Sequence, residues 1–143
     1  MSKKVLIANR GEISLRAIRA CKELGVKTVS IYSEGDKELK SLRFSDESVC
    51  VGPADPTKSY LDAPTILSAA DVTGSDAIYP GYGFLAEDHS FAEQCNLSGF
   101  KFIGPSSETI RQMGDKITAK SIVTKYGIDA VSYTHLRAHE TCG

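Results

Sequence analysis

The 143-residue chain has no long apolar segment and no excess of charge of either sign. No stretch is long and apolar enough to cross a membrane, and Met1 leads into a strand-like segment without the apolar core of a signal peptide. Lysine and arginine number 17 against 18 aspartates and glutamates, whereas a nucleic-acid binder usually carries a basic excess. We therefore expect a cytoplasmic protein with no membrane partner and no nucleic-acid partner.

The sequence also lacks the spacing of a disulfide framework or of a metal site. Its four cysteines are scattered, with no C-x-x-C pair, and are expected to be reduced thiols. They are Cys21, Cys50, Cys95 and Cys142. His135 and His139 are four residues apart, but the H-E-x-x-H order is missing and no further ligand is evident. No metal site is expected.

Apolar strand-like segments alternate with segments of helical period. Strands are expected over residues 4–8, 28–32, 48–51, 76–79 and 101–103. Helices are expected over residues 12–24, from 62–64 onward, around 91–95, from 106 to 114 and from 115 to 126. Continuous apolar strands alternating with helices predict the α/β class, with an open parallel sheet covered by helices on both faces.

Ligands of open parallel sheets bind beyond the carboxyl ends of the strands, so the residues after each strand are the candidates for a site. The first turn, Asn9-Arg10-Gly11, has one glycine and lacks the G-x-G-x-x-G fingerprint, which disfavours a nicotinamide or flavin enzyme. After the fourth strand, Gly81 and Gly83 flank Tyr82. This turn either brings the backbone close to a ligand or is a tight connection in which the tyrosine packs.

Two further sets of charged residues are open to two interpretations. Arg16, Arg19 and Glu23 fall on one side of the first helix. This side is either a surface exposed to solvent or a patch that faces a partner protein. Lys116 lies near the start of a helix, where its charge opposes the helix dipole. Its ammonium suits phosphate binding, although an exposed lysine without function fits the same position.

Several motifs, taken together and in order, resemble the N-terminal domain of biotin carboxylases. They are KVLIANRGEI at residues 4–13, RACKELG at 19–25, YPGYGFLAE at 79–87, FIGP at 102–105 and MGDK at 113–116. The family commonly has histidine where Tyr79 stands, but the Gly-Tyr-Gly sequence is intact. The narrower resemblance is to the biotin carboxylase subunit of bacterial acetyl-CoA carboxylase; pyruvate and propionyl-CoA carboxylases share the motifs.

The resemblance implies a fold, a reaction and a set of site residues. The fold is Rossmann-like, the pre-ATP-grasp domain, and the reaction is the carboxylation of biotin on a biotin carboxyl carrier protein, the first step of acetyl-CoA carboxylase in fatty acid synthesis. ATP and bicarbonate are consumed, with Mg²⁺ or Mn²⁺. Lys116 matches a nucleotide-binding lysine. Gly81, Tyr82, Gly83 and Glu87 match the active-site loop of the family. Arg16, Arg19 and Glu23 match positions at its homodimer interface.

The chain departs from this family near its C-terminus. Residues 1–113 match the N-terminal domain, residues 114–129 match the start of the ATP-grasp region, and residues 130–143 resemble translated adapter sequence and are expected to be a non-native tail. No catalytic residue or metal ligand is assigned, and the chain alone is expected to be inactive and to hold no cofactor firmly. Two alternatives are a stand-alone nucleotide-binding module and a non-catalytic interaction domain that uses the first helix.

Overall fold

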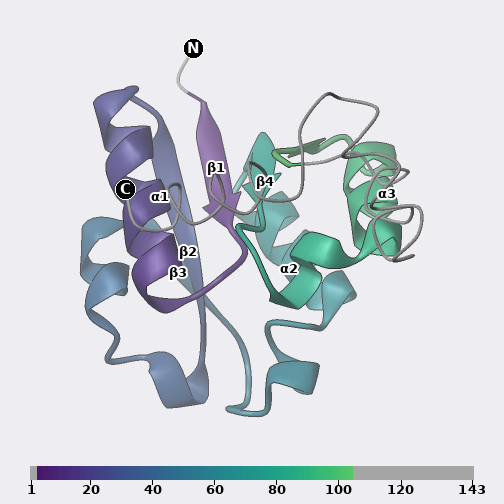
Figure 1. Cartoon of the computed structure of the whole chain (residues 1–143), viewed down its shortest axis with the longest axis horizontal. Helices are drawn as coiled ribbons and strands as arrows, with labels where there is room; N and C mark the ends of the chain where they lie inside the picture. The colour runs from purple at the N-terminus through teal and green to yellow at the C-terminus, as the bar shows by residue number, and fades with distance from the viewer. Residues whose placement is uncertain (1–2, 105–143) are drawn as a thin grey trace, which may run out of the picture.

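The computed structural model describes residues 3–104, which form one five-stranded parallel sheet. The strands are β1 (Lys4–Ile7), β2 (Lys27–Ser33), β3 (Glu47–Gly52), β4 (Ala77–Tyr79) and β5 (Lys101–Phe102). They lie in the order β3-β2-β1-β4-β5 (Figure 1). β1 is therefore central, and the predicted open parallel sheet is confirmed.

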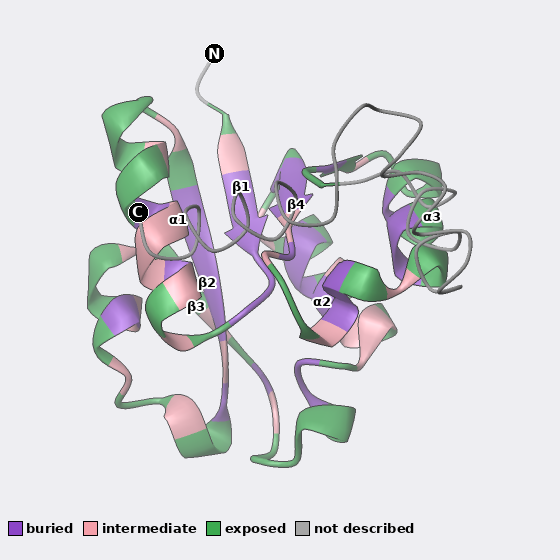
Figure 2. Cartoon of the chain, viewed as in Figure 1, coloured by how far each residue is buried: buried purple, intermediate pink, exposed green. Residues whose placement is uncertain are grey.

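Alternate residues of β1 face two separate apolar layers. Leu6 and Ala8 belong to the larger layer, which is completed by the inner faces of α2 (Ala63–Val72) and α3 (His89–Leu97). Val5 and Ile7 belong to a smaller layer under α1 (Gly11–Glu23). Side chains on successive strand residues point to opposite faces, so a central strand with two covered faces is apolar throughout. Figure 2 shows the buried residues concentrated on the strands and on the helix faces that cover them.

The helices begin and end at residues that local chemistry favours. α1 is followed by Gly25, whose φ of +72° is the left-handed conformation common after a helix. α2 begins after Asp62, with Pro64 in its first turn. These bounds were predicted. The cap of α3 was not predicted: the carboxylate of Asp88 accepts hydrogen bonds from the backbone N–H groups of Ser90 and Phe91.

Four short 3₁₀ helices were not predicted from the sequence. They are η1 (Glu34–Asp36), η2 (Lys40–Phe44), η3 (Pro56–Lys58) and η4 (Phe84–Glu87). Elements of one turn are too short to show a hydrophobic period. The helices expected over 106–114 and 115–126, and the divisions at 113 and 129, lie outside the described residues.

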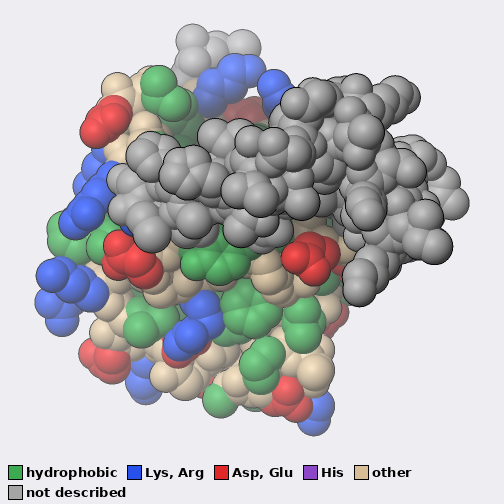
Figure 3. Space-filling model, in the orientation of Figure 1, with side chains coloured by type: hydrophobic (Ala, Val, Ile, Leu, Met, Phe, Trp, Pro, Cys, Tyr) green, Lys and Arg blue, Asp and Glu red, His purple; other side chains and the backbone are tan. Residues whose placement is uncertain are grey.

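Within residues 3–104, no helix has the length and apolarity needed to cross a membrane. Acidic and basic side chains are interspersed on the face shown in Figure 3. This distribution agrees with the near-balance of charge in the sequence.

The order of the strands places a topological switch point at β1. From β1 the chain passes through α1 to β2, and from β3 it returns through α2 to β4, on the other side of β1. The connections after β1 and β4 therefore leave the sheet toward opposite faces. In open α/β sheets, such a switch point is where ligands bind.

Two buried hydroxyl groups lie in the α1 half of the molecule. Ser14 of α1 and Ser30 of β2 are each 2% exposed, and in the described part of the chain neither hydroxyl has a hydrogen-bond partner. Thr28, two residues before Ser30 on the same strand face, is satisfied, because its hydroxyl lies 3.3 Å from both the carboxylate and the backbone N–H of Asp46. A buried hydroxyl without a partner costs stability.

We expect Ser30→Ala to raise the free energy of unfolding by about 0.5–1 kcal/mol, because it removes a buried polar group that has no partner. Urea denaturation measures the change. Thr28→Val is the matched control on the same face, and its loss of a satisfied hydroxyl is expected to lower the free energy of unfolding by about 1 kcal/mol. A clear loss of stability in Ser30→Ala would contradict the assignment of that hydroxyl as unpaired.

Candidate functional site

The side chain of Asn9 joins the turns that follow β1 and β4. Its Nδ2 donates to the backbone carbonyls of Pro80, at 2.8 Å, and of Tyr82, at 2.6 Å. Its Oδ1 accepts from the backbone N–H of Arg10 at 2.8 Å. The residue is 5% exposed, so these bonds are protected from water. One buried amide thus fixes the two turns relative to each other.

The turn after β4 is sharply bent and needs glycine at Gly81. The φ of Gly81 is +67°, and a Cβ there would lie 2.5 Å from Cδ1 of Ile13 and 3.2 Å from Nδ2 of Asn9. Gly83, at φ +73°, and Phe84, at φ +42°, continue in the left-handed region. The ring of Tyr82 is carried outward and is 49% exposed. A half-exposed ring is available to a ligand, and this favours the first of the two interpretations of the turn.

An ionic network joins the ends of β1 and β2. Nε and one terminal nitrogen of Arg10 each donate to a different carboxylate oxygen of Asp36, both at 2.7 Å. The hydroxyl of Tyr60 donates to Oδ2 of Asp36 at 2.6 Å and accepts from the backbone N–H of Ser33 at 3.0 Å. The bidentate geometry is the strong form of an arginine–carboxylate pair. This network is called the Arg10–Asp36–Tyr60 network below.

The network fixes the protonation of its members at neutral pH. Hydrogen bonds from Arg10 hold the pKa of Asp36 below its ordinary value, and the bond from Tyr60 adds to the effect. Burial raises the pKa of Tyr60, and its bond to Asp36 raises it further. The carboxyl is therefore ionised and the phenol protonated, so that the phenol is the donor in the bond between them.

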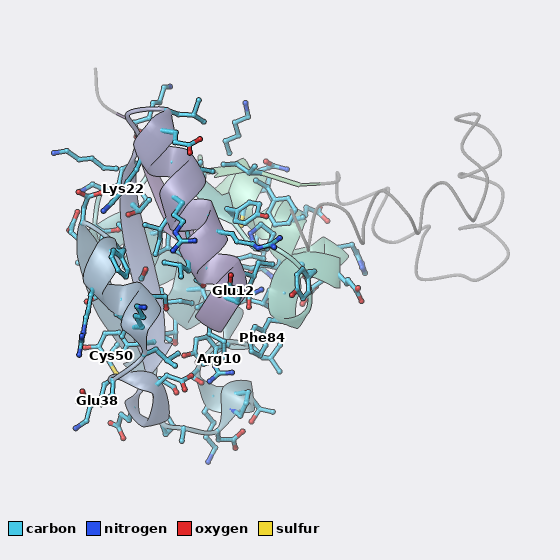
Figure 4. All side chains as sticks on the ribbon, turned by 60° about the vertical axis from the view of Figure 1, so that its left-hand side comes forward. Arg10, Glu12, Lys22, Glu38, Cys50 and Phe84 are labelled. Carbon is cyan, nitrogen blue, oxygen red and sulfur yellow. The ribbon has the colours of Figure 1, made fainter. Side chains whose placement is uncertain are left out.

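Tyr60 links this network to the turn after β4. Its ring is stacked on the ring of Phe84, with centroids 5.0 Å apart and planes 17° apart. Figure 4 shows Arg10 and Phe84 at the same end of the molecule, near the N-terminus of α1. The connections after β1, β2, β3 and β4 thus meet at one edge of the sheet.

The predicted active-site loop lies within the described residues, and its role stays a prediction. Gly81, Tyr82 and Gly83 form the turn after β4, and Glu87 lies exposed at the end of η4. Lys116 lies outside the described residues, so its proximity to the turn stays a prediction.

The three α1 residues are placed as the sequence predicted, on the side away from the sheet. Arg19 and Glu23 are exposed, and Arg16 is partly buried, with its Nε 3.8 Å from Oε1 of Glu12. The role of this face as an interface stays a prediction.

Asp36 and Tyr60 were not identified from the sequence, and no role was given to Arg10. In the sequence, all three residues lie in polar segments that follow strands, and this position was the one indication of a role. Asp36 is 26 residues from Arg10 and 24 from Tyr60 in the sequence, so no local spacing indicates the contacts.

The described residues do not complete a cofactor site. They hold no group of three or more His, Cys, Asp or Glu side chains placed for a metal ion. A hollow of about 180 Å³ is lined by Lys37, Glu38 and Arg43, among others, but it lies beside β2 and β3 and not beside the turn after β4. Small-molecule sites are usually larger.

We expect Gly81→Ala to lower the free energy of unfolding by about 2–3 kcal/mol, because the new methyl adds a clash with Ile13 to the cost of a left-handed alanine. Gly74→Ala is the matched control: Gly74 has φ +68°, but a Cβ there would meet nothing within 4 Å. This control is expected to lose about 1 kcal/mol. Equal losses on thermal or urea unfolding would mean that the turn has room for a side chain.

We expect Asp36→Asn to lower the free energy of unfolding at pH 7 by about 1–2 kcal/mol, because Arg10 loses its charged partner. The pKa of Asp36 is lowered in the folded state, so its contribution is complete above the unfolded pKa of about 4 and is lost as the pH falls further. The difference from the unmodified chain should therefore shrink at acid pH. Glu34→Gln, an exposed change in the same turn, is the control; a difference independent of pH between 3 and 7 would contradict this account.

Comparison with known proteins identifies the family. A family model described as the N-terminal domain of biotin carboxylase matches residues 1–110. The chain is 60% identical over 131 residues to the biotin carboxylase of Pseudomonas aeruginosa, a match that covers 92% of this chain and 29% of that protein. It is 47% identical over 134 residues to a pyruvate carboxylase subunit of Methanothermobacter thermautotrophicus, with coverage of 94% and 27%.

A solved structure has the same fold. It is the biotin carboxylase domain dimer of Hydrogenobacter thermophilus 2-oxoglutarate carboxylase, in complex with MgADP, ADP and bicarbonate. The TM-score is 0.80 and the identity 47%, over 89% of this chain and 28% of that one. The chain thus spans less than a third of the length of each of these proteins. By the match over residues 1–110 and these identities, the chain belongs to the biotin carboxylase N-terminal domain family.

Proposed function

We propose that this chain is the N-terminal part of a biotin carboxylase, which uses ATP and bicarbonate to carboxylate biotin on a carrier protein. The observation that carries the proposal is the pair of turns at the switch point, where the buried amide of Asn9 holds the exposed turn of Tyr82 in a chain of this family. A relative with this fold binds MgADP and bicarbonate, which supports ATP and bicarbonate as substrates here.

In this proposal the chain supplies one wall of the active site. ATP phosphorylates bicarbonate to carboxyphosphate, and carbon dioxide is then transferred to a nitrogen of biotin. The turn at Gly81, Tyr82 and Gly83 faces the reacting groups and excludes water from one side, with Glu87 nearby, while Lys116 contacts the nucleotide. The described residues offer no ligand set for Mg²⁺ or Mn²⁺, so the metal would be bound by the rest of the protein.

The finer assignments belong to the same proposal. The identity to the Pseudomonas aeruginosa biotin carboxylase exceeds that to the pyruvate carboxylase of Methanothermobacter thermautotrophicus, which favours a role in acetyl-CoA carboxylase and fatty acid synthesis. The exposed positions of Arg19 and Glu23 on α1, with Arg16, support a homodimer interface. Free thiols at Cys21, Cys50 and Cys95 suit a cytoplasmic enzyme.

We expect the purified 143-residue chain to release no phosphate from ATP when bicarbonate is added, and to bind ATP weakly at most, because a single wall cannot enclose the reacting groups. The complete enzyme that carries this segment is expected to show bicarbonate-dependent phosphate release and to carboxylate free biotin. A phosphate-release assay with and without bicarbonate measures both.

Either of two results would contradict the proposal. Bicarbonate-stimulated phosphate release from the short chain would show that its own residues complete a site. A complete enzyme without bicarbonate-dependent activity would refute the assignment of the reaction. Binding of NAD in place of ATP would favour the stand-alone nucleotide-binding module.

A further inference from the structure

We propose that Tyr60 is a positioning residue for the turn that carries Tyr82. It holds Phe84, at the far end of this turn, by stacking, while Asp36 and Ser33 hold its own hydroxyl. The expected effect of Tyr60 on the mobility of the turn follows from these contacts alone. Its expected effect on catalysis rests on the function proposed above.

Tyr60 is suited to this role because both ends of its side chain are fixed. The residue is 2% exposed, and its hydroxyl both donates, to Asp36, and accepts, from the backbone N–H of Ser33. The carboxylate it contacts is itself held by two bonds from Arg10. A tyrosine has only two side-chain torsions, so these contacts leave its ring one orientation.

Phe84 is the residue through which Tyr60 acts. Its φ of +42° is unfavourable for a residue with a side chain, and such a conformation persists only where surrounding contacts hold it. The stacked ring of Tyr60 is the aromatic contact that Phe84 makes within residues 3–104. The strained backbone at Phe84 directly follows Gly83, so stacking at Phe84 sets the path of the turn.

The turn is therefore held at both ends. Asn9 binds the carbonyls of Pro80 and Tyr82 from one side, and Tyr60 packs on Phe84 from the other. The backbone of Tyr82 is thus bound by Asn9, two residues before Phe84, while its ring is half-exposed. Loss of either point frees the ring of Tyr82 to take other directions, because glycines on both sides of it offer little resistance.

The first test measures the mobility of the turn in the 143-residue chain. The sequence contains no tryptophan, so Tyr82→Trp introduces a single tryptophan, which can be excited selectively over the tyrosines. In this background, Tyr60→Leu and Phe84→Leu are expected to accelerate the local anisotropy decay and to increase quenching by acrylamide. Tyr60→Phe keeps the ring but loses the bonds of the hydroxyl, and is expected to give a mobility between those of Tyr82→Trp alone and Tyr82→Trp with Tyr60→Leu.

Phe100→Leu is the matched control. Phe100 is partly buried against the same apolar layer but precedes β5, away from the turn. It should lower the melting temperature without changing the reporter. Equal mobility in Phe100→Leu and Phe84→Leu, or an unchanged reporter in both Tyr60→Leu and Phe84→Leu, would overturn the proposal. Should Tyr60→Leu not fold, Phe84→Leu, at a partly buried position, decides the outcome.

The second test uses the complete enzyme and separates this proposal from the proposed function. Tyr60→Leu is expected to lower kcat/KM for free biotin by about tenfold or more, since small misplacements of positioning groups are costly, while KM for ATP changes by less than about twofold. Tyr60→Phe, which keeps the stacked ring and loses the hydroxyl, is expected to show a smaller loss than Tyr60→Leu. An inactive wild-type enzyme refutes the proposed function, whereas an active enzyme indifferent to Tyr60→Leu refutes the positioning role alone.

Discussion

A single carboxamide, that of Asn9, sets the spacing of the two turns that leave the sheet beside β1. Pairing in the sheet places the ends of β1 and β4 next to each other. It does not fix the relative position of the turns that follow them, because these two turns leave the sheet toward opposite faces. The bonds from Asn9 to the carbonyls of Pro80 and Tyr82 remove that freedom. A Cβ at position 81 would lie 3.2 Å from Nδ2 of Asn9 and 2.5 Å from Cδ1 of Ile13 in α1, so the turn held by Asn9 has little room for a side chain.

The Arg10–Asp36–Tyr60 network also fixes turns relative to one another, and it does so through a charged pair. Asn9 acts through neutral hydrogen bonds that are buried, whereas Arg10 and Asp36 form a charged pair that is partly open to solvent. A carboxylate bound by a guanidinium fork and a phenol is satisfied on both oxygens, so it tolerates partial burial. The turns after β1 and β2 are thereby joined, and the ring of Tyr60 carries the constraint to β4.

Periodicity in the sequence was enough to predict the sheet, the three described helices and the turn of Tyr82. The apolar strand segments, the helical spacing of Ile13 and Ala17 and the glycine pattern depend on neighbours in sequence. The same spacing placed Leu24 on the inner face of α1, which is wrong: Leu24 is 77% exposed, and Ser14 and Ile18 are the buried residues of this helix. The 3₁₀ helices are too short to have a period, and the partners of Asp36 come from distant segments. Such contacts depend on the order of the strands in the sheet, and this order was not predicted from the sequence.

The bond from Asn9 to Tyr82 spans 73 residues, and this separation has a consequence for the order of folding. β1, α1, β2 and β3 are synthesised before β4, and the strands among them can pair with each other without it. Closing a loop of this length costs chain entropy that only the pairing of β1 with β4 repays. A nascent chain that ends within α2 lacks Pro80 and Tyr82, so water replaces both acceptors of the Asn9 Nδ2 until β4 is made.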